Sequence, residues 1–439
     1  MTDAPASLFA CNPRLLRRRA TERRFRVCGL AAILTGLAAL LILLGTVATS
    51  GTGAFRQARI HIPVVLSAEM VDPSGTGDAA AMRKVTTITY GRLIEAALHE
   101  ALAAAGIRTG ASEDEVAAMI SREAPARLRA MVLARPELRG QTLMVGLLAS
   151  GRIDGYLKGR ITKADAQRDR HVSANQLDLA DEMVAAGLLD RDWNLSFMTA
   201  TDASDLRPEA AGLGVAILGS TWMMLIVLAL SLPLGVATAI YLEEFAPKNR
   251  WTDLIEVNIA NLAAVPSIVF GVLGLAIFIN FAGLPQSTPI VGGLVLTLMT
   301  LPTIIISARA ALRAVPPSLR DAALALGASR MQAVFHHVLP LAMPGILTGA
   351  IIGLAQALGE TAPLLVIGMV AFVRDYPGAP PTGLLDPASA LPAQIYNWTQ
   401  RADPAFAERA WGAIIVLLAL LLVMNAAAVL LRRRFERRW

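Results

Sequence analysis

The sequence predicts an all-α polytopic membrane protein with a mixed α/β domain between its first two membrane spans. Of its 439 residues, 55% are hydrophobic, and the mean hydropathy is +0.53, as is typical of integral membrane proteins. The apolar residues gather into blocks of about 20, which is long enough to cross a hydrocarbon core of about 30 Å as helices. A polar segment, residues 49–212, separates the first block from the rest.

Six blocks are predicted to span the membrane. The first is about 22 residues long and no clear A-x-A site follows it, so we expect a retained anchor and not a cleaved signal peptide. The approximate bounds of the six spans are 27–48, 213–242, 257–282, 288–308, 341–372 and 410–431.

Basic residues predict the orientation of these spans, because Lys and Arg near span ends favour the cytoplasmic side. They gather in the tail 1–26, in the terminal "RRRFERRW", and in the turns after the second and fourth spans. All of these lie on one side of a six-span topology, so both termini are predicted to be cytoplasmic. The net charge of +6 is mostly this arginine and therefore gives no support to nucleic-acid binding.

The segment 49–212 is long enough for a small domain and is predicted to lie outside the cytoplasm. The only cysteines, Cys11 and Cys28, precede it, so it has no disulfide scaffold. Its predicted elements are a strand at 58–67, a helix at 89–106 ending at Gly106, a helix starting at Ser112 with Glu115 in capping-box register, and a helix at 175–189.

The cytoplasmic stretch "VPPSLRDAALALGASRMQAVFHHVLPLAMPG" (315–345) predicts two short helices held at the membrane surface between spans. Gly327 can adopt a positive φ and end the first helix. A backbone of fixed shape, held by two spans, suits docking of a soluble partner. Two capping boxes are predicted, Ser318 with Asp321 and Ser329 with Gln332.

This stretch resembles the E-A-A-x3-G-x9-I-x-L-P loop of ABC-importer permeases. Asp321 replaces the usual Glu, and His337 stands where an apolar residue is usual. The resemblance implies that residues 316–338 form the coupling loop, which sits in a cleft of an ATPase subunit. The implied contact residues are Asp321, Ala322, Ala323 and Gly327.

Flanking segments are similar to the A-type permeases of Pst phosphate ABC transporters, from about residue 213 to the end. They are "AIYLEEFAPKNRW" (239–251), "NLAAVPSIVFGVLGL" (261–275) and "GETAPLL" (359–365). The similarity implies a type I ABC importer permease fold for 213–439, in the bacterial inner membrane, with a long insert after the first span. It also implies inorganic phosphate as substrate and several partners: a C-type second permease, two ATP-binding subunits and an extracytoplasmic phosphate-binding protein.

The sequence contains no motif for nucleotide hydrolysis. It has no G-x-x-x-x-G-K-[ST] to cradle phosphates, no H-E-x-x-H and no G-x-S-x-G. We therefore expect a transporter subunit and not an enzyme, with no cofactor or metal of its own and with ATP hydrolysis on a partner chain.

The fifth predicted span carries polar residues that need an explanation. Gly345, Gly349, Gly353, Gln356 and Glu360 recur every three or four residues, so one helical stripe is expected. Small residues there allow close helix approach or leave a path. A carboxylate inside the membrane should face the bundle interior or a path, but it repels phosphate. Glu360 is therefore expected to orient a cation of the partner permease, to form a structural polar contact, or to carry a proton.

Further path candidates lie in the third span. Asn258 and Asn261 share one helix face and can donate hydrogen bonds to an oxyanion. Pro266 and Ser267 can open the helix and free backbone groups. Hydrogen bonding between helices is the alternative role for all of these side chains.

The origin of an anion-binding cation stays open. Many A-type permeases carry Arg where this sequence has Gln356, which brings no charge. Arg309 is the nearest alternative, although it could equally be a topogenic residue at the cytoplasmic boundary. In "YLEEF" (241–245), Glu243 and Glu244 are expected to meet the basic cytoplasmic surface or the ATPase.

Two other functions are compatible with the sequence. The substrate could be another oxyanion such as sulfate or molybdate, because the coupling loop does not encode substrate. From a different class, the chain could be a membrane-anchored sensor or scaffold that acts through residues 49–212.

Overall fold

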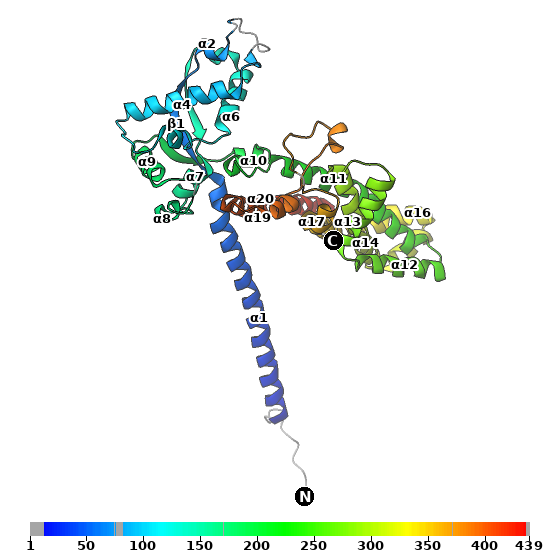
Figure 1. The fold of residues 1–439 in the computed structure, drawn as a ribbon. Coiled ribbons are helices and arrows are strands. Elements are labelled where there is room, and N and C mark those ends of the chain that lie inside the picture. Colours follow the sequence, from blue (N-terminus) through cyan, green and yellow to red (C-terminus); the bar gives the residue numbers. More distant parts are fainter. Residues whose placement is uncertain (1–12, 74, 76–81, 170, 371, 436–439) are drawn as a thin grey trace. The chain divides into compact units, whose positions relative to one another are not determined.

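The computed structural model describes residues 13–73, 75, 82–169, 171–370 and 372–435. The other residues, which include Cys11 and part of the predicted basic tail, lie outside this description. The chain divides into two units, Met1–Ser50 and Gly51–Trp439. The first is dominated by one helix, α1 (Pro13–Gly51), which contains the predicted span 27–48 (Figure 1).

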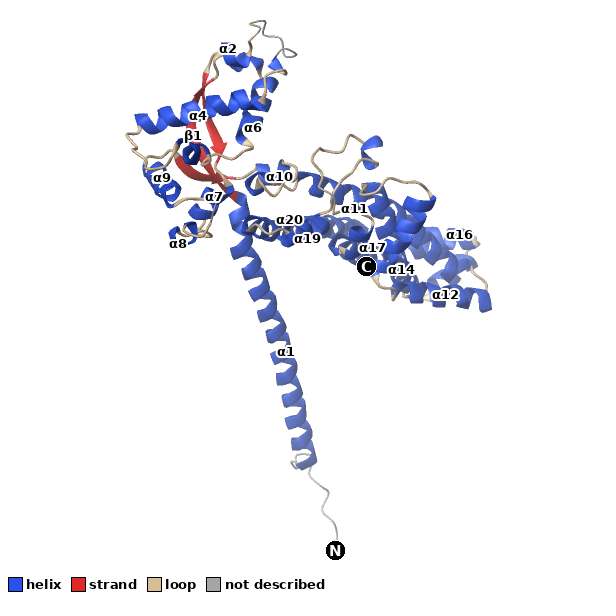
Figure 2. Ribbon diagram, in the orientation of Figure 1, coloured by secondary structure: helices blue, strands red, loops and turns tan. Residues whose placement is uncertain are grey.

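Residues 52–212, called the insert domain below, contain the sheet found among the described residues (Figure 2). The sheet has the order β2-β1-β3, and the central strand pairs antiparallel with both neighbours. Alternate residues Ile60, Ile62 and Val64 of β1 are fully buried, as expected for a strand with one covered face. The strands are β1 (Arg56–Val65), β2 (Thr142–Leu148) and β3 (Leu189–Trp193), which confirms the strand predicted at 58–67.

The helices of the insert domain bury their apolar residues against this sheet. The predicted helix at 89–106 is confirmed as α4 (Thr87–Ala104), followed by Gly106 at φ +70°. Ser112 and Glu115 form the predicted capping box of α5 (Glu113–Ala117). The helix predicted at 175–189 is α9 (Ala174–Ala185), which ends earlier because Gly187 turns the chain at φ +73° into β3. The other helices are α2 (Ala68–Val71), α6 (Ala124–Ala134), α7 (Gly151–Leu157), α8 (Lys163–Ala166) and α10 (Ser196–Thr199).

Residues 214–435 form a helical bundle with α14 (Pro289–Arg313) among its most buried helices. In the described part of the chain, five helices are long and apolar enough to cross a membrane, and one bent pair makes a sixth if it counts as one segment. The other bundle helices are α11 (Gly214–Ile240), α12 (Arg250–Ala263), α13 (Ser267–Gly274), α15 (Pro317–Ala325), α16 (Arg330–Ala333), α17 (Leu339–Gly359), α18 (Ala362–Val366), α19 (Leu391–Gln400) and α20 (Pro404–Phe435).

The third predicted span, 257–282, is not one straight helix. It is the bent pair, α12 and the segment Ser267–Phe281, whose axes differ by 102°. Pro266 stands at the break, as the N-cap of α13. A proline has no N–H for the helix and disfavours helical conformation in the preceding residue. The helix is therefore interrupted at this point, and a second helix starts in a different direction.

The fifth predicted span is also shorter than expected. α17 ends at Gly359, and Glu360 has an extended backbone with φ −75° and ψ 128°. The prediction that Glu360 continues one helical stripe is therefore wrong. Pro363 explains the position of the break, because its ring would clash with the carbonyl group four residues earlier, that of Gly359.

Glycines allow α17 to approach α14 closely. A Cβ atom at Gly349 would lie 2.2 Å from the Cβ of Ser307, and one at Gly345 would lie 2.7 Å from the Cβ of Ala311. At Gly353 the nearest atom, of Ile304, would be 3.5 Å away, which is ordinary contact. The prediction of close helix approach is therefore confirmed for the first two glycines.

We expect Gly349→Ala to destabilise the bundle by about 1–3 kcal/mol, because the added methyl group overpacks a tight helix contact. Gly353→Ala is the matched control on the same helix, and it should be neutral or slightly stabilising because Ala favours helix. Thermal unfolding in detergent measures both. Equal melting temperatures for the two variants would contradict the packing described here.

Candidate functional site

Residues 316–338, called the coupling hairpin below, form a compact turn of helices between α14 and α17. α15 ends near Gly327, which has φ +87°, and the capping box of Ser329 with Gln332 opens α16. The predicted box at Ser318 is wrong, because α15 begins at Pro317 with Pro316 as its N-cap. α16 then runs through a π-helical turn, Val334–Val338, directly into α17. The second predicted helix is thus the start of a membrane span.

The coupling hairpin presents a mixed surface with one carboxylate. Asp321, Ala322 and Gly327 are exposed, whereas Ala323 is only 6% exposed and lies in the interior. The resemblance of the loop implied all four residues as contacts and could not distinguish the three exposed ones from the buried one. Several large apolar side chains are also exposed around them: Leu324, Leu326, Met331 and Phe335. An exposed apolar tip on a fixed hairpin is typical of a protein-docking surface.

Ion pairs fix the coupling hairpin to the ends of the neighbouring helices. Arg320 donates to Glu244 through Nη2 at 2.6 Å and through Nε at 3.0 Å. The same guanidinium donates to the carbonyl oxygens of Leu312 and Val315 at 2.9 and 2.8 Å. Arg313 pairs with Glu243 at 2.8 Å. The expectation that these two glutamates meet basic residues is confirmed.

Arg309, the predicted candidate for an anion-binding cation, lies in the same layer. Its side chain is 12% exposed, and it lies 2.5 Å from the carboxylate of Glu256 and 3.5 Å from that of Glu243. Its charge is therefore balanced within the chain by two carboxylates. This pairing favours the boundary role and leaves no charge free for an anion.

The path candidates lie at the two breaks in the membrane helices. Gln356 is exposed near the end of α17, and Glu360 is partly exposed just after it. Among the described residues, no side chain forms a hydrogen bond or ion pair with the Glu360 carboxylate. A carboxylate in a membrane span is expected to face the bundle interior or a path, and this one lies directly after the end of α17.

Asn258 and Asn261 lie on α12, and Ser267 is the first residue of α13. α12 has no buried residue, and both asparagines are exposed. The Asn258 amide donates to the carbonyl of Leu254 at 2.8 Å, within its own helix. The two interrupted segments pack together where a Cβ at Gly271 would lie 2.7 Å from the Cα of Pro363.

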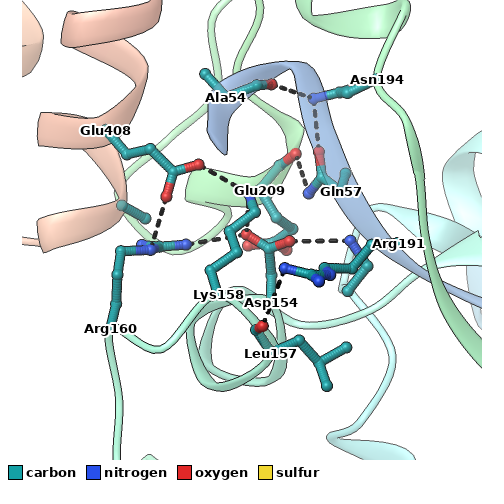
Figure 3. Close-up of polar contacts among 12 residues, drawn as sticks. Ala54, Gln57, Asp154, Leu157, Lys158, Arg160, Arg191, Asn194, Glu209 and Glu408 are labelled. Carbon is teal, nitrogen blue, oxygen red and sulfur yellow. Dashed lines mark hydrogen bonds and ion pairs between the residues drawn. The ribbon is translucent and has the colours of Figure 1, made fainter. Parts of the chain in front are cut away.

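A second polar site, which the sequence did not predict, joins the insert domain to α20. Its members are called the junction cluster below. They are Asp154, Lys158, Arg160 and Glu408 (Figure 3), together with Arg409, whose charge acts on the Asp154 and Glu408 carboxylates. Lys158 donates to Glu408 at 2.8 Å and lies 2.8 Å from Asp154. The pairing residues are about 250 positions apart, so no local pattern could indicate them.

Glu209 borders the junction cluster and is 5% exposed. Its carboxylate accepts a short hydrogen bond from the Ser121 hydroxyl, and its backbone carbonyl accepts from Gln57 at 2.8 Å. Burial raises the pKa of the Glu209 carboxyl, against the opposing effects of Ser121 and the Arg409 charge. Deprotonation of this side chain therefore costs the folded state free energy.

Glu209→Gln is expected to raise the melting temperature at neutral pH, because an amide can still accept from Ser121 and carries no charge to bury. A carboxyl whose pKa is raised by folding stabilises fully below its unfolded pKa, ordinarily 4.5, and loses that contribution as the pH rises through the folded pKa. The gain should therefore shrink as the pH is lowered toward that value. A pH-independent gain, or none relative to exposed Glu182→Gln, would contradict this account.

Comparison with known proteins places the bundle in a family. Residues 231–439 match the model for the binding-protein-dependent transport system inner membrane component. The probable ABC transporter permease protein YqgI of Bacillus subtilis is 35% identical over 210 residues, which is 46% of this chain and 71% of the relative. The chain belongs to the ABC transporter permease family. The predicted fold class, an all-α polytopic membrane permease of the type I importer kind with a mixed α/β insert, is confirmed.

Two further relatives of this permease carry a more specific name. The phosphate transport system permease protein PstA 2 of Mycobacterium bovis is 34% identical over 217 residues, 48% of this chain and 69% of the relative. PstA of Xylella fastidiosa is 30% identical over 209 residues, 48% of this chain and 70% of the relative. The permease is thus PstA-like and a multi-pass inner-membrane protein. Residues 12–167 match a separate model, described as a domain of unknown function (DUF3333).

Solved structures of ABC transporters align with about half of the permease. The MetNI methionine ABC transporter in an inward-facing conformation aligns with a TM-score of 0.40 and 18% identity, over 52% of this chain and 95% of that chain. A bacterial alginate importer aligns with a TM-score of 0.39 and 16% identity, over 51% and 79%. The sequence relatives, and not these structures, establish the family.

Proposed function

We propose that this permease is a transmembrane subunit of an ATP-driven importer of inorganic phosphate. The observation that carries the proposal is the similarity of its bundle to phosphate transport permeases, at 34% identity over 217 residues for PstA 2. The sequence has no P-loop, so the ATP-binding subunits are separate chains. A C-type second permease and an extracytoplasmic phosphate-binding protein complete the assembly, with both termini of this chain in the cytoplasm.

The coupling hairpin is the proposed contact with the ATPase. Asp321, Ala322 and Gly327 lie on its exposed surface, and buried Ala323 supports that surface from inside. Arg320 fixes the hairpin to the end of α11 through Glu244. Closure of the ATPases would therefore move α14 and α17 together with the hairpin.

The proposed path runs along the face that carries Asn258, Asn261, Ser267, Gln356 and Glu360. α12 buries none of its residues within the chain, and the Glu360 carboxylate has no partner in the described part of the chain. Both observations support a second permease packed on this face. The Asn amides and the Gln356 amide can donate to an oxyanion, and the cation that balances phosphate comes from the partner, because Arg309 is already paired.

Reconstitution in proteoliposomes with the second permease, ATPase and binding protein tests the function. We expect ATP-dependent uptake of labelled phosphate that is lost when this chain is omitted and is not inhibited by excess sulfate or molybdate. Uptake of sulfate or molybdate in place of phosphate would assign another oxyanion. Uptake that is unchanged without the chain would favour the sensor or scaffold.

Glu360→Gln is expected to lower phosphate uptake about tenfold or more, because a hydrogen bond to a charged group contributes roughly 1.5–3 kcal/mol. The complex should still assemble, because α17 ends before this residue. Uptake and gel filtration of the complex measure the two effects, with Glu182→Gln on the exposed face of α9 as the control. Wild-type uptake in Glu360→Gln would remove this residue from the path.

A further inference from the structure

The insert domain meets the start of α20 through charges that are almost fully enclosed. Glu408 receives Lys158 at 2.8 Å and Arg160 at 2.7 Å (Figure 3). The exposed fractions of these three side chains are 10%, 8% and 22%. Asp154 contacts both cations at 2.8 and 3.0 Å and also accepts from the backbone N–H of Ala58, on β1, at 2.9 Å. Glu408 therefore has its two cations only while domain and helix stay together, whereas Asp154 pairs with the same cations within the domain.

Arg409, the next residue of α20, holds the other end of the domain. It is 4% exposed and donates to the carbonyl oxygens of Ala211 at 2.6 Å and Glu209 at 2.7 Å. Its guanidinium also lies 5.7 Å from the ring of Phe197. Successive residues of a helix point about 100° apart. The neighbouring side chains of Glu408 and Arg409 therefore contact the insert domain on two different sides of α20.

An apolar layer seals the same contact. The rings of Phe197, Trp398 and Phe406 lie next to one another, with centroids 6.2 and 6.4 Å apart. A Cβ atom at Gly412 of α20 would lie 2.5 Å from the Cβ of Ala54. Arg401 adds an ion pair with Asp202 at 2.6 Å. Contacts this close and this varied leave no room for the domain to pivot on the helix.

We propose that the insert domain is a rigid extension of α20 and not a tethered module, so that domain and helix move as one body during transport. Separation would leave Glu408 without its two cations and buried Arg409 without its carbonyl acceptors, and removing one partner of a buried ion pair is strongly destabilising. A protein that docks on the domain would therefore act directly on a membrane helix. The role of this movement in transport rests on the proposed function. The rigid attachment of the domain to α20 is independent of that function.

Spin labels test the attachment in the assembled complex. In a background without Cys11 and Cys28, cysteines replace exposed Glu100 on α4 and exposed Ala407 on α20. Pulsed EPR compares the nucleotide-free complex with the complex trapped by ATP and vanadate, with loss of ATPase turnover verifying the trap. We expect one narrow distance that is the same in both states. A shift of that distance between states would overturn the proposal.

The second arm weakens the junction cluster. Glu408→Gln should broaden the label distance and lower phosphate uptake about tenfold or more, since it removes the carboxylate through which α20 pairs with Lys158 and Arg160. Glu182→Gln should change neither. An unchanged distance distribution with unchanged uptake would overturn the proposal. If Glu408→Gln does not assemble, the comparison of states in the unmutated cluster still decides. If the unmutated complex does not take up phosphate, the proposed function is wrong, but the distance comparison still tests whether the insert domain is rigidly attached to α20.

Discussion

Replacing Arg320 with Met should abolish ATP-dependent uptake while the ATPase subunits keep hydrolysing ATP. Arg320 holds the coupling hairpin through three acceptors, the Glu244 carboxylate and the carbonyl oxygens of Leu312 and Val315. Glu244 is only 9% exposed in this pair, so losing the cation leaves a buried carboxylate at a cost of about 3–5 kcal/mol. The hairpin then loses its fixed position against α11 and α14.

Uptake and ATP hydrolysis, measured on the same proteoliposomes, separate coupling from assembly. Arg330→Met is the matched control, because Arg330 also lies on the coupling hairpin and is exposed. It should retain both activities. Coupled, wild-type uptake in Arg320→Met would show that the hairpin needs no such anchor.

Arg409→Met is expected to lower the stability of the permease by about 3–5 kcal/mol. The guanidinium is the donor for two buried carbonyl oxygens, those of Ala211 and Glu209, and its charge offsets the nearby carboxylates of Asp154 and Glu408. Met fills a similar volume but supplies neither donors nor charge. The insert domain should loosen first, because the contacts of Arg409 hold its last residues.

Thermal unfolding followed by size-exclusion chromatography measures this loss, and limited proteolysis locates it. Arg433→Met tests for a general effect of removing an arginine from α20, because Arg433 lies exposed near the other end of that helix. Cleavage should increase within residues 52–212 in the Arg409 variant alone. Equal melting temperatures for the two variants would contradict the role given to Arg409.

Local sequence patterns predicted the parts of the fold that local interactions determine. Gly327 and the capping box at Ser329 depend on neighbouring residues, and both appear as expected. The box at Ser318 failed because the consecutive prolines start α15 at Pro317, which places Ser318 inside the first turn. The helix breaks were only partly foreseen. The spans were predicted from the length of the apolar blocks, which does not show where a helix is interrupted. The turn at Pro266 and the end of α17 depend on the geometry of proline.

Contacts between distant segments could not be predicted in this way. Lys158 is one of several lysines in a polar segment, and Glu408 precedes an apolar span like many other charged residues. Only folding brings their side chains within 2.8 Å. The pairing of Arg309 with Glu256 is similar, which is why Arg309 looked available for an anion when the sequence was considered alone.

The buried position of Ala323 has a consequence for how such permeases can be re-engineered. Because that methyl group supports the coupling hairpin from inside, the shape of the hairpin does not depend on Leu324, Leu326 or Met331, which point outward. The outward side chains can change without altering the bundle. On the proposed contact of this hairpin with an ATPase, exchanging these three residues between paralogous permeases should redirect a permease to a different ATPase while leaving its substrate and its folding unchanged.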